Sequence, residues 1–227
     1  MPFTITWYGH AAMGLELSGN RILVDPFITD NPVATVKAND LEADFILISH
    51  GHGDHVGDAL AIAKRCKATV ISNFEIASWF EAQGVKIHPQ HIGGGFMHPF
   101  GYLKLTLALH GSALPDGSYG GNPSGFLLTT LQEARIYFAC DTGLFGDMRL
   151  IGDEGIDLAV LPIGDNFTMG PKDALRAVKL IEPEHVVPIH YNTWDLIAQD
   201  PNAWAERVRG ETQTTPHVLQ PGESVTL

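Results

Sequence analysis

His50-Gly51-His52-Gly53-Asp54-His55 is the stretch around which this chain is organised. It places three imidazoles and one carboxylate within six positions. Residues 44–49, just before it, form a short apolar run, which is typical of a fully buried strand. Residues 58–67, after it, carry apolar side chains at helical spacing. The sequence therefore predicts a tight strand-to-helix turn on which metal-binding or acid–base side chains converge.

The side chains of this turn are expected to point in two directions. In a locally extended turn His50 and His52 share a face, because side chains alternate along an extended chain. Asp54 and His55 then point elsewhere, where the backbone bends into the helix. A plain solvated turn would use Gly, Asn, Ser or Pro, and imidazoles packed beside a carboxylate without a metal leave donors and charges poorly matched. The pattern therefore predicts one turn that supplies ligands to two neighbouring metal ions.

The rest of the chain alternates between predicted strands and helices. Strict alternation of apolar and polar residues over 103–109 predicts a strand with one buried face, and Pro171 is suited to the first turn of a helix that ends before Pro183. The other expected elements are strands at 3–8, 13–17, 21–25, 69–72, 85–88, 126–130, 135–139, 158–163 and 185–189, a helix at 74–83, and a short strand near 217–219. This order predicts an α/β fold, a four-layer αβ/βα sandwich, with residues 1–227 as a single domain.

Two polar segments show no ligand spacing. Residues 111–125 are rich in Gly, Pro and Ser and predict a long loop, of the kind that forms a site wall or a lid. His88, His91 and His98 surround a run of three glycines without repeating the spacing of the ligand turn. We interpret these three histidines as hairpin or rim residues.

The His-x-His-x-Asp-His motif after an apolar strand resembles the signature of the metallo-β-lactamase superfamily. Further segments fall in that family's order and at similar spacing, so the resemblance covers nearly the whole chain. They are residues 19–27, 109–112, 139–143, 161–171 and 188–193. Within the superfamily, the sequence is most similar to the UPF0173 metal-dependent hydrolases. The resemblance implies the same four-layer αβ/βα fold and a metal-dependent activity.

The resemblance also implies a set of seven metal ligands, five imidazoles and two carboxylates. They are His50, His52 and His110 for one ion, Asp54, His55 and His190 for the other, and Asp141 as the bridge between them. A set of this kind without a thiolate suits two divalent ions, with Zn expected first and Mn, Fe or Ni as alternatives that the ligand types do not exclude.

Four side chains are assigned further roles. Asp54 is the candidate catalytic group, which orients the attacking hydroxide or accepts its proton. The resemblance suggests that Asp25 braces the ligand turn through hydrogen bonds, although an Asp before a Pro is equally typical of a simple turn. His10 and Asn166 are candidate substrate contacts, and for His10 a buried, hydrogen-bonded histidine is an equal alternative.

The composition restricts the partners. The chain has 14 Lys and Arg against 26 Asp and Glu, a formal charge of −12, so a nucleic-acid surface is not favoured. No signal-peptide pattern is visible, no apolar run approaches the roughly 18 residues of a membrane helix, and Cys66 and Cys140 do not make a disulfide framework. We therefore expect a cytoplasmic protein that acts on a small molecule, without a membrane partner, as a monomer or a homo-oligomer.

The expected reaction is hydrolysis. A hydroxide that bridges two metal ions would attack an ester, a lactone or a phosphodiester of a small-molecule substrate. One alternative is a nuclease of the metallo-β-lactamase fold that acts on RNA or DNA. A second is a di-iron redox protein, which would need a flavin domain for which 227 residues leave no room. The third is a non-catalytic metal-binding protein.

Overall fold

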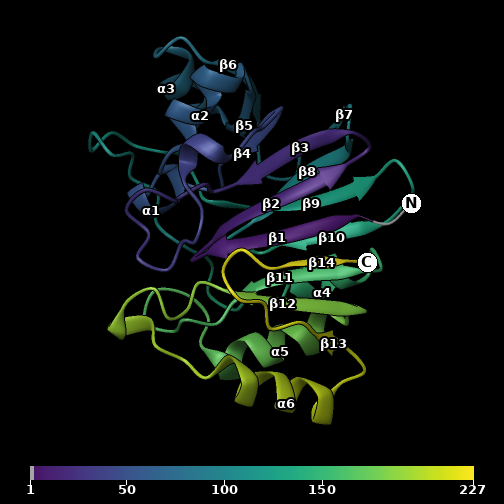
Figure 1. Cartoon of the computed structure of the whole chain (residues 1–227). Helices are drawn as coiled ribbons and strands as arrows, with labels where there is room; N and C mark the ends of the chain where they lie inside the picture. The colour runs from purple at the N-terminus through teal and green to yellow at the C-terminus, as the bar shows by residue number, and fades with distance from the viewer. Residues whose placement is uncertain (1–2) are drawn as a thin grey trace.

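The computed structural model describes residues 3–227, and its strands form two seven-stranded sheets packed face to face (Figure 1). The first sheet contains, in spatial order, β14 (Ser224–Thr226), β1 (Thr4–Gly9), β2 (Ala12–Leu17), β3 (Asn20–Val24), β4 (Phe45–Leu47), β5 (Thr69–Asn73) and β6 (Lys86–Gln90). The second contains β13 (Thr215–Pro216), β12 (His185–Ile189), β11 (Leu158–Pro162), β10 (Arg135–Phe138), β9 (Ser124–Thr130), β8 (Gly101–Leu107) and β7 (Gly95–His98).

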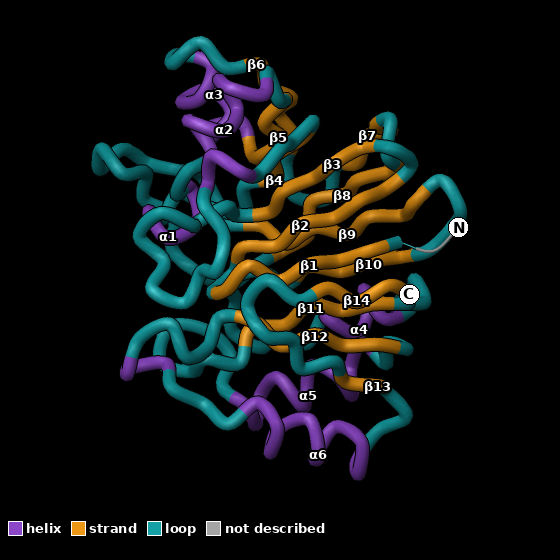
Figure 2. The backbone as a smooth tube through the Cα atoms, viewed as in Figure 1, coloured by secondary structure: helices purple, strands orange, loops and turns teal. Residues whose placement is uncertain are grey.

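Helices cover the outer face of each sheet, as the tube in Figure 2 shows. Those on the first sheet are α1 (Gly53–Val56), α2 (Ala59–Cys66) and α3 (Phe74–Glu81), and those on the second are α4 (Met148–Gly152), α5 (Pro171–Ile181) and α6 (Pro201–Glu211). Two short 3-10 helices, η1 (Ala38–Asp40) and η2 (Asp195–Ile197), lie in loops. The predicted four-layer αβ/βα sandwich is therefore confirmed. Among residues 3–227, no helix has both the length and the apolar character needed to cross a bilayer.

Two apolar layers hold the sandwich together. The larger lies between the sheets and under α4–α6, and the smaller lies between the first sheet and α2 and α3. Helix α5 illustrates the link from sequence to packing: Pro171 opens it, and Leu175, Val178 and Ile181 share its buried face. It ends at Glu182, which adopts a left-handed conformation before Pro183, as the sequence predicted.

Strand direction brings the ends of several strands to one edge of each sheet. In the first sheet β1, β3 and β4 run in the same direction, because β2 is antiparallel to both β1 and β3 and β4 is parallel to β3. In the second sheet β8, β10 and β12 share one direction in the same way. Residues that follow these strands therefore lie along the carboxyl edges of the sheets, where α/β proteins place their sites.

The structure corrects three details of the sequence prediction. The prediction of a short strand near 217–219 is wrong, because this segment lies between β13 and β14. These two strands belong to different sheets, and the chain crosses from one sheet to the other through a turn in which Gly222 has a φ of +89°. Strand β7 was missed. Because β6 and β7 lie in different sheets, residues 91–94 form a crossover, whereas His98 lies in the β7–β8 hairpin, as expected.

We expect core packing to dominate stability, and two leucines of one hairpin test this. Leu128 in β9 is 0% exposed, whereas Leu131 in the following turn is 51% exposed. Leu128→Ala should lower the free energy of unfolding by about 2–5 kcal/mol, and Leu131→Ala by less than about 0.5 kcal/mol. Urea titrations of the chelator-treated protein measure both. Equal losses in the two variants would contradict the described packing.

Candidate metal centre

The ligand turn is fixed between two neighbouring segments. Residue Gly57, with a φ of +37°, ends α1 where a Cβ atom would lie 2.6 Å from the Cα atom of Phe27. At Gly51 a Cβ atom would lie 2.9 Å from the carbonyl carbon of Ala113, which belongs to the predicted loop 111–125. Both positions require glycine because the backbones approach so closely. The turn is thus held against residues 26–27 on one side and the loop on the other.

A hydrogen-bond network behind the turn sets the tautomers of two histidines. The carboxylate of Asp25 accepts bonds from the Ser49 amide (2.8 Å), the Ser49 hydroxyl (2.5 Å) and His55 Nδ1 (2.8 Å). Since the single hydroxyl proton of Ser49 points to Asp25, its oxygen accepts the bond from His50 Nδ1, 2.9 Å away. Both histidines therefore carry their proton on Nδ1, and their Nε2 lone pairs face the site, as metal ligation requires.

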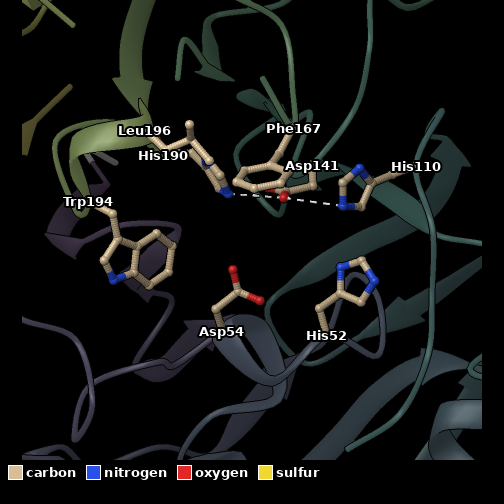
Figure 3. Close-up of a pocket in the computed structure, with 8 residues that line it drawn as sticks. All are labelled: His52, Asp54, His110, Asp141, Phe167, His190, Trp194 and Leu196. Carbon is tan, nitrogen blue, oxygen red and sulfur yellow. Dashed lines mark ion pairs between the residues drawn. The ribbon is translucent and has the colours of Figure 1, made fainter. Parts of the chain in front are cut away.

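The structure brings the seven predicted ligands together in two groups. The ligand atoms of His50, His52 and His110 lie within 4.8 Å of one another, as do those of Asp54, His55 and His190, and a ring nitrogen of His10 lies within this distance of the second group. Asp141 lies between the groups: its Oδ2 atom is 3.3 Å from His55 Nε2, 3.5 Å from His110 Nε2 and 3.0 Å from His190 Nε2. Figure 3 shows the last two of these contacts across the cavity. The division into two metal sites stays a prediction.

Strained backbone marks the edge where these residues meet. His10 after β1, Asp25 after β3, Cys140 after β10 and His190 after β12 have φ angles of 54°, 45°, 52° and 57°. A left-handed conformation at a residue other than glycine costs roughly 1–2 kcal/mol. Such residues cluster at functional sites, where the surrounding structure enforces them. Four of them along one edge therefore indicate a site rather than ordinary loops.

Buried polar atoms in the centre fit bound cations. His55 Nε2, Asp141 Oδ1 and both ring nitrogens of His190 are buried and have no hydrogen-bond partner within residues 3–227. Each unsatisfied buried polar group costs about 1–3 kcal/mol. Lone pairs of imidazole and carboxylate oriented toward one point are the donor set of a divalent transition-metal site. The residues present therefore fit the metal ions that the sequence predicted.

The charges of the centre also favour a cation. Burial lowers the pKa of His50 well below 6.5, and burial lowers that of His110, so both are neutral at pH 7. Burial has the same effect on His55, but the carboxylates of Asp141 and Asp25 outweigh it and raise the pKa of His55 well above 6.5. The two carboxylates thus favour positive charge at His55, which a cation bound at Nε2 would supply in place of a proton.

The family relationship follows from comparison with known proteins. The family described as Beta-lactamase superfamily domain matches residues 20–191. A UPF0173 metal-dependent hydrolase of Bacillus cytotoxicus is 51% identical, and the alignment covers 98% of this chain and 99% of that protein. This chain belongs to the UPF0173 family. The predicted resemblance is confirmed.

Other UPF0173 relatives and a solved structure agree with this. A UPF0173 metal-dependent hydrolase of Desulforamulus reducens is 52% identical, over 96% of this chain and 97% of that one. The structure of Igni18, a metallo hydrolase from the archaeon Ignicoccus hospitalis, superposes with a TM-score of 0.93 at 36% identity, covering 100% of this chain and 99% of that one. The similarity thus extends over the full length of these relatives.

In this UPF0173 chain, His10 lies behind the ligands rather than in front of them. Its side chain is 0% exposed, with Nδ1 2.8 Å from Thr193 Oγ1 and Nε2 3.1 Å from Asp54 Oδ2. The Thr193 hydroxyl therefore donates to Nδ1, and His10 Nε2–H donates to the Asp54 carboxylate. Burial lowers the pKa of His10 to about 4. The structure does not support the expected substrate contact and instead shows the alternative, a buried, hydrogen-bonded histidine.

A cavity of about 470 Å³ opens onto the ligands (Figure 3). Its polar wall consists of five candidate ligands, namely His52, Asp54, His110, Asp141 and His190. Its apolar wall consists of Phe167, Trp194 and Leu196. Asn166, the other expected substrate contact, is exposed on the turn after β11 and is not among the lining residues; its neighbour Phe167 is.

Sequence reasoning missed Ser49 and the apolar wall. The signal for Ser49 was its place directly before His50 on a buried segment, where a hydroxyl needs a partner. Large apolar residues in polar loops after β11 and β12 were the signal for the wall. His88, His91 and His98 lie in neither ligand group, and that they bind no metal stays a prediction.

His98 offers a test of burial by pH. Its ring stacks on Phe100 (centroids 5.1 Å apart), and Nε2 is 3.0 Å from Gln90 Oε1. Burial, aided by nearby His88, lowers the pKa of His98 from 6.5 to about 4. The unfolded chain thus takes up a proton near pH 6.5 that the folded state accepts only near pH 4. The free energy of unfolding therefore falls as the pH falls through this window.

We expect His98→Phe to weaken this pH dependence, because the variant lacks the group that titrates. Urea midpoints of chelator-treated protein between pH 7 and pH 4 measure it. His91→Gln, which alters an exposed imidazole, is the control and should keep the wild-type slope. A wild-type slope in His98→Phe would show that another group causes the acid sensitivity.

Proposed function

We propose that this UPF0173 protein is a hydrolase that uses two divalent metal ions, Zn first, to cleave an ester, lactone or phosphodiester of a small molecule. The observation that carries the proposal is the position of Asp141 Oδ2, within 3.5 Å of three imidazole nitrogens contributed by both sheets. A carboxylate placed between two groups of ligands is the arrangement of a bridged pair of ions. Relatives described as metal-dependent hydrolases support the reaction class.

The open side of the centre favours catalysis over a structural role. Structural metal sites are closed cages of four protein ligands, whereas catalytic sites keep an open position. Here five candidate ligands face a cavity of about 470 Å³. When bound, two such ions supply a water activated near neutral pH and stabilise negative charge on the scissile group.

Asp54 is the protein group best placed to act on that water. Its side chain is 31% exposed toward the cavity, and its Oδ2 atom is held by His10 at 3.1 Å. Burial alone would raise the pKa of Asp54, but the hydrogen bond from His10 outweighs it and the pKa lies below its usual range. The carboxylate therefore stays ionised and serves by accepting a hydrogen bond and orienting the water. Its other oxygen accepts no hydrogen bond within residues 3–227 and is available to an ion or to that water.

A small substrate is favoured over nucleic acid. The formal charge of −12 repels a polyanion at long range, and a nuclease would need basic side chains along a groove. The test is a panel of esters, lactones, phosphodiesters, RNA and DNA, each assayed with Zn, Mn, Fe and Ni. Cleavage of nucleic acid far faster than of any small substrate would establish the nuclease alternative. No cleavage of anything by protein that holds two ions would establish the non-catalytic one.

The proposal predicts a metal stoichiometry. Protein treated with a chelator and reconstituted should bind two transition-metal ions per chain, because each group offers three ligands and Asp141 serves both. Elemental analysis after gel filtration measures the ratio, and an increase in the unfolding temperature should accompany it. A ratio of one or less at saturating metal contradicts the two-ion site.

Removing the bridge should separate metal binding from folding. We expect Asp141→Ala to lower turnover by at least about a thousandfold and to weaken metal binding, since the two ions lose their shared ligand. Circular dichroism should remain that of the wild type. His91→Ala is the control, because His91 is exposed and outside both groups, and it should keep both ions. Metal loss in His91→Ala, with retention in Asp141→Ala, would reverse the assignment.

A further inference from the structure

The apolar wall of the cavity consists of large apolar side chains that are exposed to solvent. Phe167, Trp194 and Leu196 are 51%, 40% and 62% exposed, yet all three line the cavity beside the candidate ligands (Figure 3). Exposed apolar side chains scattered singly need no explanation, but a group of them at a site marks a binding surface. Covering such a surface gains roughly 25 cal/mol per Å².

The wall is built rigidly from two loops. Gln199 Nε2 donates to the carbonyl of Gly164 at 3.0 Å and so joins the loop after β12 to the loop after β11. The Trp194 ring packs edge-on against His10, with ring centroids 4.9 Å apart. Backbone bonds from Asn192 N to Ile197 O and from Ile197 N to Trp194 O, both 3.0 Å long, close the turn that carries Trp194 and Leu196. A surface whose backbone is held in this way binds with a smaller ordering cost.

The cavity offers no ion-pair partner for a second charged group. Among its lining residues, all of which lie within residues 3–227, none is Lys, Arg, Ser, Thr, Asn or Gln. Its polar groups are the candidate metal ligands, which are committed to the ions, and the indole N–H of Trp194. A carboxylate placed against the wall would lose part of its hydration and could gain at most one hydrogen bond, from Trp194, and no ion pair, which is costly.

We propose that the substrate is an uncharged carboxylic ester or lactone whose acyl part carries a compact apolar group that packs on Phe167, Trp194 and Leu196. This rests on the proposed function and specifies its substrate class. The cavity of about 470 Å³ holds an acyl group of several carbons beside the scissile bond, within the roughly 300–1,000 Å³ of small-molecule sites. Nucleotides and substrates with a carboxylate on the acyl group are disfavoured.

The test compares three 4-nitrophenyl esters that share one leaving group. The hexanoate presents an apolar acyl chain, the acetate lacks the chain, and the glutarate monoester carries a carboxylate at its end. With zinc-loaded protein we expect kcat/KM to be at least about tenfold higher for the hexanoate than for the acetate. It should be at least about a hundredfold higher for the hexanoate than for the glutarate, because the carboxylate meets no ion-pair partner.

Matched leucine variants locate the effect. Leu196→Ala should lower the hexanoate-to-acetate ratio by about fivefold or more, and Phe167→Ala should do the same. Leu150 in α4 is 64% exposed, against 62% for Leu196, but lines a different cavity. Leu150→Ala should therefore leave the ratio unchanged. A ratio unaffected by both Leu196→Ala and Phe167→Ala, or a preference for the glutarate, would overturn the inference while leaving the hydrolase itself standing.

A binding measurement separates this inference from the proposed function. Saturation-transfer NMR with 4-phenylbutanamide, an uncharged non-substrate, on chelator-treated protein should show binding that Leu196→Ala weakens and Leu150→Ala does not. If no ester, lactone or phosphodiester is cleaved but this binding is seen, the hydrolase proposal fails and the apolar site remains. If the amide does not bind, the apolar site is wrong whatever the enzyme cleaves.

Discussion

The buried carboxylate of Asp141 is the interaction on which the centre depends. A charge in the interior costs several kcal/mol unless it is paired. Asp141 Oδ2 lies within 3.5 Å of the Nε2 atoms of His55, from the first sheet's ligand turn, and of His110 and His190, from the second sheet. Burial raises its pKa, but the imidazoles of His190 and His55 outweigh burial and hold it well below its usual range. The carboxylate can stay ionised only if the two sheets meet at this edge.

The edges meet because the strands that deliver ligands run in one direction within each sheet. Strand direction alone does not orient a side chain, however. At four strand ends, left-handed backbone at residues other than glycine sets the direction in which the chain continues. The Asp25–Ser49 network then fixes the tautomers of His50 and His55. The fold thus accepts local strain and buried polar groups at one place, and binding of a cation is what compensates them.

The sequence predicted the parts of this arrangement that have local causes. Alternation and apolar runs predicted the strands, Pro171 predicted the start of α5, and the clustered histidines predicted the ligand turn. The sequence prediction failed where pairing between distant segments determines the structure. Strand β7 was missed because most of its residues are exposed, and the sheets to which β13 and β14 belong depend on a crossover of the chain. His10 needed the same information. It is buried by Thr193, Asp54 and Trp194, which are remote from it in the chain.

The loop after β12 contributes both a candidate metal ligand and part of the apolar wall. The chain after β12 supplies the ligand His190, then Thr193, which bonds His10 behind Asp54, and then Trp194 and Leu196 of the wall. Trp194 contacts His10 directly, so a change of shape there disturbs the support of Asp54 as well as the wall. Leu196 is 62% exposed and does not form part of that support. If the wall binds substrate as we propose, a change at Leu196 alters substrate preference without altering the candidate ligands, whereas a change at Trp194 alters the wall and the support of Asp54 together.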